Sequence, residues 1–155
     1  MTIAVNWTTV MTSIAGLSIS GASPAITIKD IDAIPDSARL LCPLIIPDPN
    51  GAVSNAASSR ASTGGGGSGL LDLNYVLNYI YLHCEARSGI NNFSAYQSLY
   101  SNVALIIKTI LQNDNITGAV DMELNSIGTP VEIPDPAGNK FLGITFSLKV
   151  KEFAQ

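Results

Sequence analysis

Few residues of this chain have types and spacing that could do chemistry, and a glycine-rich stretch is the first to test. The segment STGGGGSG, residues 62–69, satisfies the pattern G-x-G-x-x-G through Gly64, Gly66 and Gly69. A dinucleotide-binding loop needs a strand leading into it and a helix starting from it, so that the helix N-terminus meets the pyrophosphate. Here small polar residues precede the glycines, an alternating apolar segment follows them, and the lysine of a phosphate-binding loop is missing. The stretch therefore does not predict a nucleotide site.

The side chains for nucleophilic or metal chemistry are equally sparse. His83 is the only histidine and lies in the middle of an apolar strand pattern, where a packed residue is the commoner interpretation. No G-x-S-x-G surrounds Ser68. One histidine with two distant cysteines, Cys42 and Cys84, falls short of any zinc-binding spacing. We expect both thiols to be reduced and buried. The sequence predicts no enzyme, no metal and no cofactor.

Two similar turns carry the remaining candidate carboxylates. IPDPNG occupies residues 46–51 and IPDPAG residues 133–138, and each follows a predicted strand. An aspartate after proline in a turn is explained by its own backbone hydrogen bonds, so Asp48 and Asp135 predict hairpin turns rather than a catalytic pair. The two carboxylates could meet only if the two turns lay together.

Composition narrows the class of protein. The chain has 155 residues, 46% of them hydrophobic and only 13% charged, about half the usual fraction, with a net charge of −4. This length fits one domain, residues 1–155, with a real core. The eight basic residues are scattered, so a nucleic-acid-binding footprint is missing, and no run reaches the length of a membrane span. A surface so short of charge favours either contact with other protein or a Ser/Thr/Asn-rich monomer surface.

The elements that must position these residues follow from apolar periodicity. Helical spacing marks residues 7–17 and 96–111, and period-two alternation marks strands at 38–46, 71–84, 120–124 and 142–150. Pro43 and Pro47 place the first strand at a sheet edge. We therefore expect an α+β fold with the order α-β-β-α-β-β. Its antiparallel sheet of roughly four strands is packed by two helices, in a core built from Leu142, Ile144, Phe146, Leu148 and Val150 against Leu99, Val103, Ile106 and Ile110, with Trp7, Met11 and Ile14 joining.

Residues 52–69 show no apolar periodicity and predict a long Gly/Ser-rich loop between the first two strands. A single GGGGS copy is also a common engineered linker, but the preceding SNAASSRAST has the same composition, which favours a native arm. We expect this loop to be mobile in the free subunit and ordered by a neighbour, since loops of such length are usually functional or disordered.

The chain resembles the tail-terminator proteins of long-tailed bacteriophages. The resemblance rests on the ending AGNKFLGITFSLKVKE, on the Tyr-rich strand after a flexible loop and on the element order, and it covers nearly the whole chain. It implies a virion protein, assembled in the host cytoplasm, that forms a hexameric ring, caps the tail tube and joins it to the head and neck. The implied partners are other copies of itself, the tail-tube protein and the head-closure protein, while DNA passes through the lumen without specific binding.

Two alternatives stay open. Within the same class the chain could be a head-closure adaptor or a tail-tube subunit, and in another class a small monomeric module that binds a peptide on its sheet edge. Loops at the faces of a ring are the natural assembly contacts. The candidate interface residues are Asp48, Asn50, Arg60, Gly64, Gly66, Gly69, Asp135 and Asn139.

Overall fold

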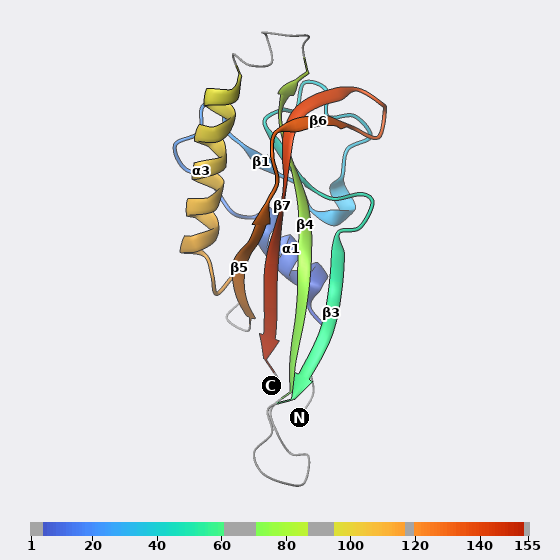
Figure 1. Ribbon diagram of the computed structural model, residues 1–155, viewed down its shortest axis with the longest axis vertical. Helices are drawn as coiled ribbons and strands as arrows, with labels where there is room; N and C mark the ends of the chain where they lie inside the picture. Colours follow the sequence, from blue (N-terminus) through green and yellow to red (C-terminus); the bar gives the residue numbers. More distant parts are fainter. Residues whose placement is uncertain (1–4, 61–70, 87–94, 117–119, 154–155) are drawn as a thin grey trace.

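Two long antiparallel strands form the centre of the molecule. The computed structural model describes residues 5–60, 71–86, 95–116 and 120–153, and in it β4 (Leu71–Glu85) pairs with β7 (Lys140–Phe153). Both strands run along the long axis of the molecule (Figure 1). We call the end where β4 finishes and β7 begins the upper end, as it stands in Figure 1.

Shorter strands pair with each side of this central pair. Two of them follow one another along β4, namely β2 (Leu44–Pro47) and β3 (Val53–Arg60), and two follow one another along β7, namely β5 (Val120–Ile127) and β6 (Val131–Pro134). The two-residue strand β1 (Thr27–Ile28) pairs with β2 in parallel. The result is one mixed sheet of seven strands in the order β1-β2-β4-β7-β5, with β3 beside β4 and β6 beside β7.

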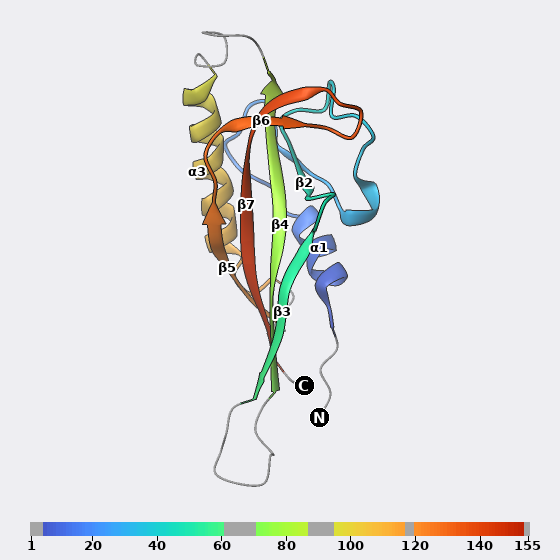
Figure 2. The same ribbon diagram turned by 45° about the vertical axis from the view of Figure 1, so that its right-hand side comes forward.

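One face of the sheet, which we call the inner face, is covered by helices α1 (Trp7–Ala15) and α3 (Tyr96–Gln112). Figures 1 and 2 show both helices on the same side of the central strands. Alternate residues of β4 and β7 meet the apolar stripes of the helices because side chains in a strand alternate between faces. Tyr79 stacks on its cross-strand neighbour Phe146, with ring centroids 5.6 Å apart, and Trp7 meets Tyr75 edge-on at 5.9 Å.

The opposite face, which we call the outer face, is covered only at its upper end. There the segment between the 3-10 turn η1 (Ile31–Ala33) and β2 lies over a second apolar cluster, against which Ile34, Ala38 and Cys42 pack. The buried members of this cluster are Ala38, Leu44, Ile46, Ile80, Leu82 and Phe141. This explains why the second half of β4 is apolar on both faces.

The predicted fold class is wrong in its strand count, its element order and its purely antiparallel sheet. The sheet has seven strands and one parallel pair, and the described elements follow the order α1, β1, η1, β2, β3, β4, α3, β5, β6, β7. The physical reason is that β4 and β7 are each long enough to pair with two short strands on one side. Strands of two to four residues leave too short a pattern to be seen as alternation.

The first predicted strand is also wrong over most of its length. Only Leu44–Pro47 is a strand, while residues 38–43 form a turn in which Leu41 N–H donates to Ala38 O and Leu40 has a φ of 67°. The edge placement fails too, because β1 lies beside Leu44 and Ile45. Pro47 tolerates its position because it lies past the last residue that β1 reaches.

The predicted loop over residues 52–69 is wrong in its first half. Residues Val53–Arg60 form strand β3, which pairs with β4 although its sequence is rich in Ser and Ala. The neighbouring strand supplies the backbone partners, and this tertiary context outweighs the low strand propensity of the segment. Residues 61–69, where the mobile arm was expected, lie outside the described residues.

Several predictions are confirmed. The long strand at 71–84 and the strand at 142–150 are β4 and β7, and the expected core residues all belong to one inner cluster, with Trp7 packed at its margin. IPDPAG is a hairpin turn between β6 and β7. IPDPNG is not a hairpin turn, because β2 and β3 on either side of it pair with the same strand.

Candidate assembly surface

The lower half of the outer face is a sheet surface made of polar side chains. The residues of β4 and β7 that alternate with the inner core residues point here, and so do Asp121 and Glu123 of β5. From β4 and β7 the face receives Asp72, Asn74, Val76, Asn78, Thr145, Ser147, Lys149 and Lys151. Figure 2 shows no described helix in front of the lower strands on this side of the sheet. Ser147 is nevertheless buried, because side chains of β5 bond to it, and the other polar groups are partly or fully exposed.

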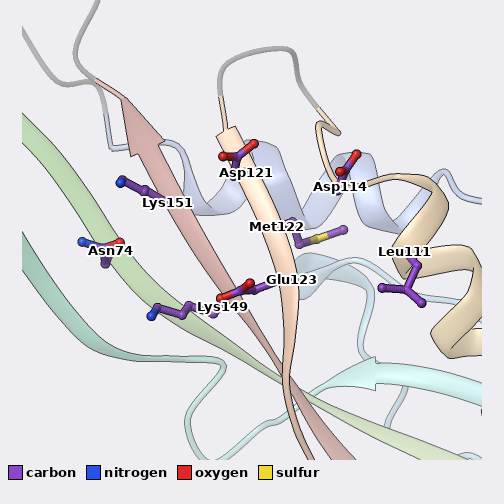
Figure 3. Close-up of a pocket in the computed structure, with 8 residues that line it drawn as sticks. All are labelled: Asn74, Leu111, Asp114, Asp121, Met122, Glu123, Lys149 and Lys151. Carbon is purple, nitrogen blue, oxygen red and sulfur yellow. The ribbon is translucent and has the colours of Figure 1, made fainter.

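Opposite charges alternate across this face. Lys151 Nζ lies 3.4 Å from Asp72 Oδ2, and Lys151 is also the cross-strand partner of Asp121. One step along β7, Lys149 is the cross-strand partner of Glu123, and Figure 3 shows both side chains above the same part of the sheet. Opposite charges on directly facing strand residues attract one another. The two lysines thus stand among three carboxylates.

Hydrogen bonds made by side chains connect the neutral part of the same face. Ser147 Oγ accepts from Asn125 Nδ2 at 3.0 Å and lies 2.7 Å from Ser126 Oγ. On the β3 side, Asn78 Nδ2 donates to Ser54 Oγ at 3.0 Å and to Gly51 O at 2.9 Å. These bonds leave fewer side-chain groups for an incoming ligand.

The face ends in a hollow of about 470 Å³ that reaches around the edge of β5. Figure 3 shows Leu111 and Asp114 on the α3 side of β5 and the two lysines on the other side. The carbonyl of Asp114 accepts the N–H of Met122 at 2.7 Å, so this backbone group of β5 points away from β7. Leu111 is 65% exposed. The hollow therefore combines charged groups, an exposed leucine and a strand edge.

A second polar cluster ties the upper end of β4 to the first turns of α3. His83 is the extra residue of a β-bulge, which turns its side chain toward α3. Asn102 Nδ2 donates to Tyr81 Oη at 2.8 Å, Tyr81 Oη lies 2.6 Å from His83 Nδ1, and His83 Nε2 lies 2.8 Å from Ser98 Oγ. Ser98 Oγ in turn donates to Ala95 O at 3.0 Å.

The direction of these hydrogen bonds decides what the cluster can do. Because Ser98 Oγ gives its only proton to Ala95 O, it accepts from His83 Nε2–H, and the Nδ1 of the neutral ring then accepts the Tyr81 proton. A general base would have to accept the serine proton instead. Burial lowers the pKa of His83, which keeps the ring neutral. This arrangement holds α3 in place and does not activate Ser98.

Both cysteines line a hollow of about 480 Å³ beside this cluster; they are not joined in a disulfide, and they are half-buried rather than buried. Burial raises the pKa of Cys42 to about 12, and the nearby Cys84, Glu85 and Asp135 add to that rise. A thiol with so high a pKa is a poor nucleophile. Among the described residues, no three His, Cys, Asp or Glu side chains converge to hold a metal ion.

The predicted interface residues separate into those the structure brings together and those it does not describe. Asn50 and Asp135 line one hollow of about 380 Å³ on the upper outer face, so the two proline turns do lie together. Arg60 is the last residue of β3, and its side chain lies outside the described part. Gly64, Gly66 and Gly69 fall in the same category.

Asp135 fastens its turn to the segment that covers the upper face. Its buried carboxylate accepts Ala38 N–H at 2.9 Å and Asn139 N–H at 2.8 Å, and Asn139 Nδ2 adds bonds to Asp135 and Ser37. Desolvation alone would raise the pKa of Asp135, but these hydrogen bonds together hold it below its usual value. Asp48 makes a smaller turn in which its carboxylate accepts Asn50 N–H at 2.9 Å. Asp135 and Asn139 are thus structural residues.

The charged rows and a buried carboxylate were not predicted from the sequence. Two predicted strands each carry charges on every second residue: acids at Asp121 and Glu123, and lysines at Lys149 and Lys151. These opposite charges at the same spacing were the signal that the two strands pair. Glu152 is 2% exposed, and its Oε1 accepts from Tyr75 Oη at 2.7 Å and from Asn6 N–H at 2.8 Å. Glu152 lies two residues after Val150, where the alternation of β7 places the next residue of the inner face. An acidic residue at that position was the only sign of the buried carboxylate in the sequence.

Comparison with known proteins gives no family for this chain. Neither a scan against protein-family models nor a search of curated proteins finds a match. The described helices include none with the length and apolar character needed to cross a membrane.

Proposed function

We propose that the protein is a structural subunit that assembles with its own copies into a ring around a lumen, as a phage tail terminator does. The observation that carries this proposal is the polar half of the sheet, on which two lysines stand among three carboxylates. A globular enzyme has little use for a broad polar sheet face without a catalytic group. A lumen through which another molecule moves needs such a face.

Charge supports a lumen that carries DNA. Proteins that hold DNA offer lysine or arginine groups to the phosphates, and each phosphate contact strengthens binding. Here Lys151 is engaged with Asp72 at 3.4 Å, and Lys149 stands beside Glu123. The carboxylates repel the backbone of a passing duplex while the lysines soften that repulsion. DNA would slide past this face without being held.

The layer arrangement supports the same orientation. Both helices lie on the inner face of the sheet, away from the polar surface. In a ring, the outer layer has a larger circumference than the layer around the lumen. Helices are wider than strands, so they fill the outer layer better. With the helices outside, the polar face lines the lumen, and the upper end with its proline turns forms one ring face. Contacts with the tail-tube protein and the head-closure protein would lie on the two ring faces.

The electrostatic part of the proposal has a direct test. Asp121→Lys combined with Glu123→Lys turns the face strongly positive without touching the core, because both side chains are exposed. The matched control is Asp32→Lys with Asp36→Lys, two exposed acids of the segment between β1 and β2. Assembled wild-type protein and the control should not retain duplex DNA at about 100 mM salt, and the face variant should retain it in a salt-dependent way. Equal retention by both variants contradicts a lumen at this face.

The biological role is tested by removing the gene from the phage that carries it. Tails of uncontrolled length that fail to join heads are the expected result for a terminator. Tails of normal length that still fail to join heads would favour the head-closure adaptor. Among the described strands β5 pairs only with β7, and this edge favours one alternative from another class, a monomeric module that captures a peptide as an added strand. A monomeric mass by light scattering at high concentration would select it.

A further inference from the structure

The sheet ends in two free edges that run in opposite directions. In the described part of the chain, β3 pairs only with β4, and β5 pairs only with β7. Every neighbouring pair in the row β3, β4, β7, β5 is antiparallel. Four alternating strands leave the last one antiparallel to the first. If a second copy in the same orientation is placed beside the first, β5 of one and β3 of the other are therefore antiparallel.

The two edges also stand at the same level along the strands. The pairing register joins residues of all four strands into straight rows across the sheet. Two such rows are Asp121–Lys151–Asn74–Ala57 and Leu124–Leu148–Leu77–Val53. Each row begins on β5 and ends on β3. A neighbour that continues the sheet needs no shift along the strand direction.

The backbone groups that face outward match on the two edges. Met122 N–H points away from β7 to Asp114 O, so Val120 and Leu124, each two residues away, also turn their backbone groups outward. On the other edge, Asn78 N–H donates to Ala52 O, so the backbone groups of Asn78 point toward the β3 side of β4. Because backbone groups of successive strand residues point in opposite directions, those of the odd-numbered residues of β4 point toward β7. The β3 residues opposite these odd positions therefore point outward.

Those outward residues of β3 are Ser58, opposite Leu73, and Val53, opposite Leu77. They stand in the same rows as Val120 and Leu124. The interruptions of the two edges coincide as well. β3 has a bulge at the level of Tyr75, and that row ends on β5 at Met122, the residue whose outward N–H is already bonded.

We propose that copies of this chain join edge to edge, β5 of one copy pairing antiparallel with β3 of the next, in the register that places Asp121 beside Ala57. This inference rests on the proposed ring and names the contact that would build it. The contact is heterologous, since it uses two different surfaces of one chain, and such contacts form closed rings when successive copies return to the start without an offset. The level edges remove an offset along the strand direction, which is the part of that condition that the register decides.

The register can be tested by a cross-link that cannot form within one chain. Ala57 and Asp121 are separated by three strand spacings, about 14 Å at about 4.8 Å each. A disulfide needs Cα atoms within about 7 Å. The double variant Ala57→Cys, Asp121→Cys can therefore be cross-linked only between copies. Controls are the two single variants and the pair Ala57→Cys, Glu123→Cys, which is displaced by two residues.

Under mild oxidation the double variant should give a ladder of covalent multimers that ends at the mass of the ring. We expect at least about ten times more covalent product above the dimer than in any control. Cross-linked dimers without higher species would indicate pairing of like edges and overturn the inference. Equal yields from the displaced pair would overturn the register.

A second variant tests the edge without cysteines. Ser58→Pro removes an outward N–H that the sheet of its own chain does not use, and Ser58→Ala keeps that N–H as the matched control. The assembled fraction should fall at least tenfold in the proline variant only, while its melting temperature as a monomer stays within about 2 °C. The mass of wild-type protein by light scattering separates the two proposals. Rings in the wild type without cross-links in the variant refute the edge contact alone, whereas a wild type that stays monomeric refutes both.

Discussion

The upper and lower halves of the outer face belong to the same strands, yet one is apolar and covered while the other is polar and open. Ile80 and Leu82 of β4 lie under the segment that carries Ala38, and six residues before each of them Asn74 and Val76 on the same face have no cover among the described residues. A long strand does not need to change its residue types in this way in order to form. The difference teaches that the lower half is built to meet water or a hydrated partner.

Truncation of an apolar side chain should give the largest difference in the free energy of unfolding between the two halves. Phe141→Ala removes a fully buried ring from the upper cluster and should cost about 3–5 kcal/mol in the free energy of unfolding. Val76→Ala on the lower half removes a side chain that is only partly buried and should cost less than about 1 kcal/mol. Urea denaturation of both variants measures this difference. Equal costs would mean that the lower half is covered as well.

The carboxylate that fastens the cover gives the next largest effect. Asp135→Ala leaves Ala38 N–H without its buried acceptor and should cost about 1–3 kcal/mol at pH 7. Asp48→Ala, in the turn that holds no cover, should cost less. Because the folded pKa of Asp135 is lowered, its contribution is complete above the ordinary pKa of about 3.9 and is lost as the pH falls below it. Denaturation curves at pH 3 and pH 6 check the sign.

The His83 cluster should make stability depend on pH in a different range. The pKa of His83 is lowered in the folded protein, so the unfolded chain takes up a proton first as the pH falls below about 6.5. Stability should therefore decrease from pH 7 to pH 5. His83→Asn should remove this slope, and the assignment is unambiguous because His83 is the only histidine. A slope that persists in the variant would place its origin elsewhere.

The charged rows of the lower half should contribute least to folding. Asp72→Asn removes the partner of Lys151 on an open surface, and the expected cost is below about 1 kcal/mol. The loss should vanish at about 1 M salt, where the Debye length is about 3 Å. Thermal denaturation at low and high salt measures it. A large, salt-independent cost would mean that these charges are structural rather than part of an open surface.

The long elements of the fold could be predicted from sequence, and the short ones could not. β4, β7 and α3 carry apolar patterns over fourteen or more residues, so their faces and the inner core follow from periodicity alone. β3 has the sequence VSNAASSR, which lacks any apolar pattern, and it forms because β4 offers a long partner. The segment at 38–43 is misleading in the opposite way. Leu40 fits an apolar alternation but is 95% exposed in a turn.

The candidate surface was less visible than the core for a similar reason. A single strand shows which residues share a face, but charge pairing across strands appears only once the register is known. Lys149 and Glu123 lie far apart in the sequence. The bulges in β3 and β5 also change which residues of neighbouring strands lie opposite each other. The two proline turns were recognised as turns, and their meeting around one hollow depended on the paths of β2 and β6.

The long pairing of β4 with β7 from Asp72 to Glu85, interrupted by the bulge at His83, has a mechanical consequence. Antiparallel hydrogen bonds lie perpendicular to their strands. A force that pulls along the long axis therefore loads all the bonds of this pair in shear at once, whereas a force across the sheet would open them one after another. A particle built with these strands along its axis would resist stretching far better than splaying, which suits a part that stands in line with a load.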